Sequence, residues 1–82
     1  MRSLVGENVR QLRISRGMTQ ERLAEVSGFS QQYISDLERG RRNPTVVSLF
    51  DLAQALKATP AELVMQRFDQ NELLSRVAGT MV

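Results

Sequence analysis

The sequence predicts an all-α fold, a bundle of five helices followed by a short sixth. Apolar residues recur at spacings of three and four, capping residues precede several of these stretches, and no stretch shows the alternation of a half-buried strand. At 82 residues the chain is long enough for one domain with a modest core. We expect residues 1–68 to form that domain and residues 69–82 to extend it as a helix that contributes to dimerisation.

Three helices are expected in the first half of the chain, over residues 4–16, 20–27 and 31–39. Thr19 and Ser30 can cap the second and third helices, and Gly28 separates them by a break of about three residues. Two short helices with such a break are the signature of a helix-turn-helix. The inward-facing residues are predicted to be Val5, Val9, Leu12, Leu23, Ala24, Ile34 and Leu37.

A short basic loop, residues 40–44, is expected to precede the fourth helix. Pro44 disfavours a helical conformation at Asn43, and Thr45 can cap the helix that follows. The inward stripe of the fourth helix is predicted to be Val46, Leu49, Ala53 and Leu56.

The last two helices are expected to begin at capping signals. Thr59, Pro60 and Glu62 form a capping box with proline at the first helical position. The apolar residues of this fifth helix are Leu63, Val64 and Phe68. The sixth helix is predicted from the box pattern of Asp69 and Glu72 and from the apolar residues Leu73, Leu74 and Val77 before Gly79.

The composition excludes several kinds of chemistry. Cysteine and histidine are both absent, which removes disulfides, zinc fingers and histidine general bases. We expect no catalysis, no cofactor and no bound metal ion, since no catalytic constellation can be recognised. No apolar run approaches the roughly 18 residues that a membrane span needs, and residues 1–10 lack the apolar stretch of a signal peptide. We therefore expect a soluble cytoplasmic protein that does not bind membranes.

Positive charge is concentrated in the first half of the chain, although the net charge is only +2. Residues 1–45 carry eight arginines against five acids, whereas residues 46–82 carry three bases against four acids. The planar guanidinium of arginine suits phosphate groups and base edges. Genome composition also produces arginine richness, so the count alone does not identify a partner.

The outward face of the third helix carries groups that can read DNA bases. With about 100° of rotation per residue, Gln32, Asp36 and Arg39 point away from the inward residues, with Ser35 beside them. Gln31 lies on a flank of this face. Glutamine can bond adenine, arginine can bond guanine and aspartate can accept from cytosine. An ordinary solvated face has the same composition, so this helix alone does not decide between the two interpretations.

The residues that flank this face favour a nucleic acid. Gln20 opens the second helix, where free backbone amides can meet a phosphate. Arg41, Arg42 and Asn43 follow the third helix and can hold the same backbone further along. Such contacts give salt-dependent affinity rather than sequence choice.

The stretch TQERLAEVSGFSQQYISDLERGRRNP resembles the lambdoid phage repressor and Cro-type (XRE-like) helix-turn-helix family, including its single-domain bacterial relatives. The residues that match the family pattern are Gln20, Ala24, Gly28, Ile34, Leu37, Glu38, Arg39, Gly40, Asn43 and Pro44. The resemblance extends back through residues 8–13 and forward to about Leu63. It implies a repressor-like bundle whose second and third helices form the motif, and a transcription regulator that binds double-stranded DNA.

The resemblance also implies roles for individual residues, with the third helix in the major groove and the second across the backbone. By this resemblance the base-reading positions are Gln31, Gln32 and Asp36, and we add Ser35 because it lies beside them on the outward face. The phosphate contacts are assigned to Gln20, Ser30, Tyr33, Arg39, Arg41, Arg42 and Asn43. Arg13 and Glu38 match a pair that forms a buried salt bridge in several relatives, so we assign them to the structure.

Two residues depart from the family pattern. Ser27 stands where many members have an aliphatic residue, so packing near the turn is expected to depend on Phe29. Asp36 places a negative charge on the reading face. Three consequences of this charge stay open: Asp36 selects cytosine, Arg39 three residues on neutralises it, or it discourages binding to adenine-rich sites.

A homodimer is expected, because a single reading helix contacts few base pairs. The residues assigned to its interface are Val47, Phe50, Leu63, Val64, Leu73, Leu74 and Val77. In the alternative, the last helix folds back over the fourth and fifth helices within one monomer.

Two functions stay open at this point. The first is a homodimeric repressor, or a controller that also activates, on an inverted-repeat operator. The second is the antitoxin of a toxin–antitoxin pair, which binds a toxin protein and regulates its own operon. Such a role usually requires an extension that wraps the toxin, and only residues 69–82 are available for it.

Overall fold

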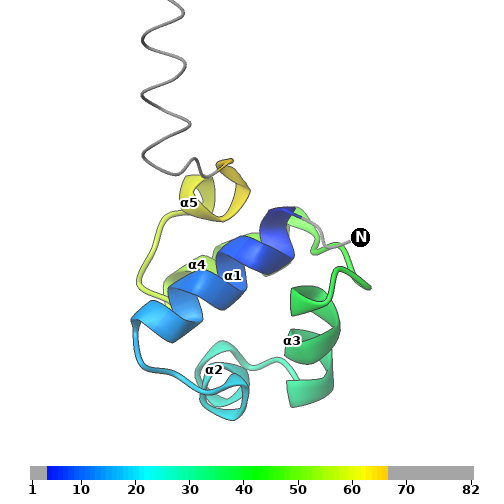
Figure 1. The fold of residues 1–82 in the computed structure, drawn as a ribbon, viewed down its shortest axis with the longest axis vertical. Coiled ribbons are helices and arrows are strands. Elements are labelled where there is room, and N and C mark those ends of the chain that lie inside the picture. The colour runs from blue at the N-terminus through cyan, green and yellow to red at the C-terminus, as the bar shows by residue number, and fades with distance from the viewer. Residues whose placement is uncertain (1–3, 67–82) are drawn as a thin grey trace, which may run out of the picture.

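The computed structural model describes residues 4–66, which form five α-helices (Figure 1). They are α1 (Leu4–Ser15), α2 (Gln20–Ser27), α3 (Gln31–Glu38), α4 (Val46–Ala55) and α5 (Pro60–Val64). No strand occurs among residues 4–66, and the prediction of an all-helical fold is confirmed. No helix in this range is long and apolar enough to cross a lipid bilayer. The predicted sixth helix and Phe68 lie outside the described residues.

Hydroxyl side chains start four of the helices, as the sequence predicts. The side-chain oxygens of Thr19, Ser30, Thr45 and Thr59 each accept a hydrogen bond from the backbone amide three residues on, at 3.0 to 3.3 Å. Each bond satisfies one of the amides that a helix start leaves without a partner. Two helices end one residue earlier than predicted, since Arg16 follows α1 in a turn and Arg39 is the C-cap of α3.

The core joins all five helices around α1. Its buried apolar residues are Val9, Leu12, Leu23, Ala24, Ile34, Leu37, Leu52, Ala53, Leu56 and Leu63. Burying each of the larger side chains contributes about 1.5–3 kcal/mol. α1 packs against both α3 and α5, while α2 and α3 lie together at the opposite end of the bundle from α5 (Figure 1). The helix-turn-helix is therefore supported from one side by α1 and α4.

The inward stripe predicted for α4 is wrong at its first residue. Val46 is 68% exposed, whereas Leu52, Ala53 and Leu56 are buried and Leu49 is partly buried. The spacing between Val46 and Leu49 is that of one helix face, but Val46 is the first residue of α4. The other helices cover the later turns of α4 but leave the Val46 side chain at its start exposed.

A buried asparagine links α1 to the end of α5. The Asn8 side chain is 1% exposed, and its Nδ2 donates to the backbone oxygens of Leu63 (2.9 Å) and Met65 (2.8 Å). Carbonyl groups at a helix end lack partners within the helix, and Asn8 supplies donors for two of them. These bonds join residues 55 and 57 positions apart, so no local pattern in the sequence predicts them.

Candidate nucleic-acid interface

The turn between α2 and α3 is built by Gly28 and Ser27. Gly28 has φ +83°, a conformation that favours glycine, and its amide donates to the Ala24 oxygen at 3.0 Å. The Ser27 hydroxyl donates to the same oxygen at 3.4 Å and accepts from the Phe29 amide at 3.3 Å. A hydroxyl thus closes the turn. Phe29 is half-buried against the core, as expected.

The Arg13 and Glu38 side chains form a buried ion pair that joins α1 to α3. Arg13 Nε lies 2.7 Å from Glu38 Oε2, and its Nη2 donates to Oε1 at 3.0 Å. The two side chains are 12% and 3% exposed. Arg13 Nη1 also donates to the Met18 oxygen at 2.8 Å, so each of the three guanidinium nitrogens has a hydrogen-bond partner. The pair holds α3 at a fixed position on α1 and has no free face toward a ligand.

Gln20 lies at the start of α2, but its amide is occupied by this pair. Gln20 Nε2 donates to Glu38 Oε1 at 3.2 Å, and the side chain is only partly exposed. The bond links the start of α2 to α3. A phosphate would therefore meet the outer hydrogen of this amide and the backbone amides of the first turn of α2.

The outward face of α3 combines exposed glutamines with a half-buried carboxylate. Gln31 and Gln32 are exposed, whereas Ser35 and Asp36 are half-buried. Gln32 Nε2 donates to Asp36 Oδ1 at 3.0 Å, one helical turn further on. The ion-pair partner of Asp36 is Arg42, with its Nε 3.9 Å from Oδ2. One expectation is that Arg39 neutralises the Asp36 charge. In the structure Arg42, from the loop after α3, pairs with Asp36 instead.

The basic loop folds back toward this face because of how α3 ends. Gly40 has φ +78°, its amide donates to Leu37 O at 3.0 Å, and the Arg41 amide donates to Asp36 O at 2.8 Å. This pair of bonds is a Schellman motif, which reverses the chain at a helix C-terminus. The side chains of Arg39, Arg41, Arg42 and Asn43 are all exposed after the reversal.

Tyr33 supports the loop instead of standing free. Its ring stacks on Phe29 with centroids 4.6 Å apart and planes at 15°. The guanidinium carbon of Arg42 lies 5.3 Å from the Tyr33 centroid, within cation–π distance. Both rings pack against the core, so Arg42 rests on a rigid platform.

The arrangement brings most of the predicted DNA-contact residues to one surface. Ser30, Gln31, Gln32 and the loop residues 39 and 41–43 are exposed there. Arg39 and Arg41 form no ion pair within residues 4–66, whereas the only acids of α3, Asp36 and Glu38, are both paired. The surface therefore offers unpaired positive charge and amide groups, which suits a polyanion with readable base edges.

One residue predicted in the dimer interface is placed elsewhere by the fold. Leu63 is fully buried in the core of the monomer, so its assignment to a dimer interface is wrong. Val47, Phe50 and Val64 are 70%, 58% and 48% exposed. Val46 and Met65, which the sequence analysis did not assign there, are also exposed, at 68% and 59%. The remaining assigned residues, Leu73, Leu74 and Val77, lie outside the described residues.

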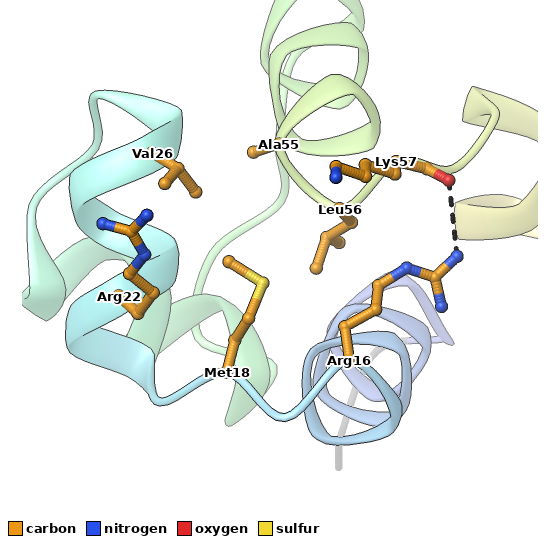
Figure 2. Close-up of a pocket in the computed structure, with 7 residues that line it drawn as sticks. All are labelled: Arg16, Met18, Arg22, Val26, Ala55, Leu56 and Lys57. Atoms are coloured by element: carbon orange, nitrogen blue, oxygen red, sulfur yellow. Dashed lines mark hydrogen bonds between the residues drawn. The ribbon is translucent and has the colours of Figure 1, made fainter.

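A separate hollow of about 320 Å³ lies between α2 and the ends of α1 and α4 (Figure 2). Its lining residues are Arg16, Met18, Arg22, Val26, Ala55, Leu56 and Lys57. Arg16 Nη2 donates to the Lys57 oxygen at 3.3 Å across one edge (Figure 2). None of the predicted site residues lines this hollow. Within residues 4–66, no three metal-ligating side chains gather at one place.

Known proteins resemble this chain over most of its length. A family model described as helix-turn-helix matches residues 9–63. An uncharacterised HTH-type transcriptional regulator, y4dJ of Sinorhizobium fredii, is 61% identical over 64 residues, which cover 78% of this chain and 83% of the relative. The control protein C.SmaI of Serratia marcescens is 38% identical over 72 residues, 88% of this chain and 86% of the relative.

A solved structure agrees with these sequence relatives. The restriction-modification controller protein C.AhdI from Aeromonas hydrophila superposes with a TM-score of 0.71 at 42% identity, over 73% of this chain and 91% of that one. The relatives are transcription regulators, which is a non-enzymatic role. The chain therefore belongs to the helix-turn-helix (HTH_3, XRE-type) family and is a transcriptional regulator related to the restriction-modification controllers.

Proposed function

We propose that the protein is a homodimeric regulator that reads an inverted-repeat operator through the major groove. The observation that carries this proposal is the series of contacts from the exposed Gln32 through Asp36 to Arg42 in the exposed basic loop, with the exposed Gln31 next to Gln32 in sequence. Amide side chains can bond base edges, while arginines that flank them bind phosphates. The α3 helix is then the reading helix, and α2 crosses the DNA backbone.

The Arg13–Glu38 ion pair gives this surface its rigidity. A reading helix must keep its position relative to the phosphate contacts, because an error of about 1 Å weakens directional hydrogen bonds. α3 is fixed to α1 by the ion pair and to the start of α2 by Gln20. The Schellman motif fixes the basic loop to the other end of α3.

Dimerisation is proposed through the exposed apolar residues of α4 and α5. Val46, Val47 and Phe50 lie on one face at the start of α4, and Val64 and Met65 end α5. Exposed apolar groups of this size favour a partner surface. A two-fold axis between two copies would place two α3 helices about one DNA turn apart.

Among regulators, the relatives favour a controller. C.SmaI is a control protein, and C.AhdI is a controller of a restriction-modification system. The antitoxin interpretation gains no support from these relatives. We therefore propose that this chain controls transcription by binding its own operator, and that the concentration of the protein determines how much of the operator is occupied.

Binding measured across salt concentrations tests the phosphate contacts. Arg41→Ala is expected to weaken binding to every duplex by a similar factor, because a phosphate contact carries no sequence information. The slope of log K against log salt should fall by about 1, the share of one phosphate. Fluorescence anisotropy with an operator and a random duplex measures both quantities.

Lys57→Asn is the matched control for this experiment. It also removes one positive charge, but Lys57 lies at the hollow of Figure 2, away from the α3 surface. Asparagine tolerates the positive φ of +54° at this position, so the backbone should keep its conformation. An equal loss of affinity and slope in both variants would show that Arg41 acts only through net charge.

A further inference from the structure

We propose that Asp36 is a positioning residue that sets base preference by orienting Gln32, with its own charge offset by Arg42, and does not itself read a base. The proposal rests on the DNA-reading function proposed above and assigns one residue of that surface a different task. The negative charge of Asp36 on the reading face then has a positioning task and does not select cytosine.

The Asp36 carboxylate already has a partner on each oxygen. Oδ1 accepts from Gln32 Nε2 at 3.0 Å, and Oδ2 lies 3.9 Å from Arg42 Nε. The side chain is only 19% exposed. Reading cytosine would require the carboxylate to turn outward and leave both partners, which costs their hydrogen bond and their charge pairing.

The bond to Asp36 fixes which end of the Gln32 amide faces outward. An ionised carboxylate only accepts hydrogen bonds, so Gln32 must present its nitrogen to Asp36. The amide nitrogen has a second hydrogen, which remains available together with Oε1 on the other edge of the group. One donor and one acceptor side by side are what a glutamine needs to bond adenine through N7 and N6. Asp36 therefore holds Gln32 in a reading orientation before DNA arrives.

Arg42 is held at the edge of the same face by two different contacts. The Tyr33 ring lies under its guanidinium at 5.3 Å, and Asp36 lies beside it at 3.9 Å. Arg42 is still 57% exposed, so its other donors are accessible to DNA. Its charge also offsets that of Asp36, which would otherwise repel the phosphates.

Selection of bound sequences from random duplexes tests this assignment. The proteins are wild type, Gln32→Ala, Asp36→Ala, Asp36→Asn and the double variant Gln32→Ala/Asp36→Ala. Asp36→Ala is expected to relax preference at the base pair that Gln32→Ala also relaxes, by about tenfold, with no further loss in the double variant. Asp36→Asn should retain part of that preference, since the asparagine oxygen can still accept from Gln32 but its amide nitrogen, a donor, no longer forces the Gln32 nitrogen toward it.

Two controls separate positioning from other causes. Glu25→Ala removes an exposed acid that also pairs with an arginine, so it shows what loss of charge alone does to selection. Thermal unfolding of the Asp36 variants shows whether the fold is retained.

Three results would overturn the assignment. In the first, Asp36→Ala leaves every preference intact. In the second, Asp36→Ala erases a preference for cytosine at a base pair of its own, with an effect that adds to that of Gln32→Ala. Loss of preference in Asp36→Asn equal to that in Asp36→Ala would also contradict it. If the wild-type protein selects no sequence, the proposed function itself fails, which is a distinguishable outcome.

Discussion

Replacing Glu38 with alanine is expected to lower the free energy of unfolding by about 3–5 kcal/mol. The glutamate is 3% exposed and accepts two hydrogen bonds from Arg13 and one from Gln20. Without it, the Arg13 guanidinium stays in a site that is 12% exposed and has no counter-charge. Breaking one side of a buried pair costs more than the pair contributes, because the remaining charge is desolvated. Urea denaturation measures this loss.

The Arg22–Glu25 pair provides a control, because it is also an arginine–glutamate ion pair but is exposed to solvent. These side chains are 61% and 62% exposed, at a separation of 3.2 Å. Glu25→Ala should change the unfolding free energy by no more than about 0.5 kcal/mol. Glu38→Gln should fall between the two variants, since it keeps the side-chain volume and one acceptor. A loss for Glu38→Ala as small as that for Glu25→Ala would contradict the structural role of the Arg13–Glu38 pair.

Replacing Phe50 with aspartate is expected to convert the proposed homodimer to a monomer and to weaken operator binding by about 100-fold or more. Phe50 is 58% exposed at the start of α4, beside the exposed Val46 and Val47. A carboxylate at this position would be buried without a partner in an apolar interface, which is costly. A monomer engages one half-site only and loses the gain of simultaneous binding. Analytical ultracentrifugation and operator titration measure the two effects.

Ile14→Asp is the control for oligomeric state, because Ile14 is 53% exposed on α1 and lies outside the proposed interface. It should sediment as wild type does. If Phe50→Asp still forms the wild-type dimer, the interface does not include the start of α4. If the variant is monomeric but binds the operator with wild-type affinity, the homodimer is not the binding species.

The helices and the outline of the surface follow from local chemistry. A hydroxyl that accepts a hydrogen bond from the backbone amide three residues on favours a helix start, and Thr19 and Ser30 do so here. The rotation of 100° per residue places Glu38 on the inward side of α3, where the structure has it. Local rules of this kind depend on neighbours in sequence, so the sequence determines their outcome.

What could not be predicted depends on contacts between distant elements. Helical periodicity predicts which way the Val46 side chain points. It does not show that no other part of the bundle covers this first residue of α4, which is exposed. It also places Leu63 among apolar residues without telling whether the monomer or a partner buries it. The partner of Asp36 lies in a loop that turns back over α3, and a count of three or four along the helix finds Arg39 instead of Arg42. The bonds of Asn8 to the end of α5 are another contact between distant elements.

Selection of bound sequences by wild-type protein and by Gln31→Ala tests the central claim, that α3 reads DNA bases, most directly. Wild-type protein should select an inverted repeat with half-sites about one DNA turn apart. Gln31→Ala should weaken the base preference at one position of each half-site by about 1–3 kcal/mol. The preferences at the other positions should stay unchanged. An equal loss of affinity on every sequence, or no inverted repeat with wild-type protein, would contradict base reading by α3.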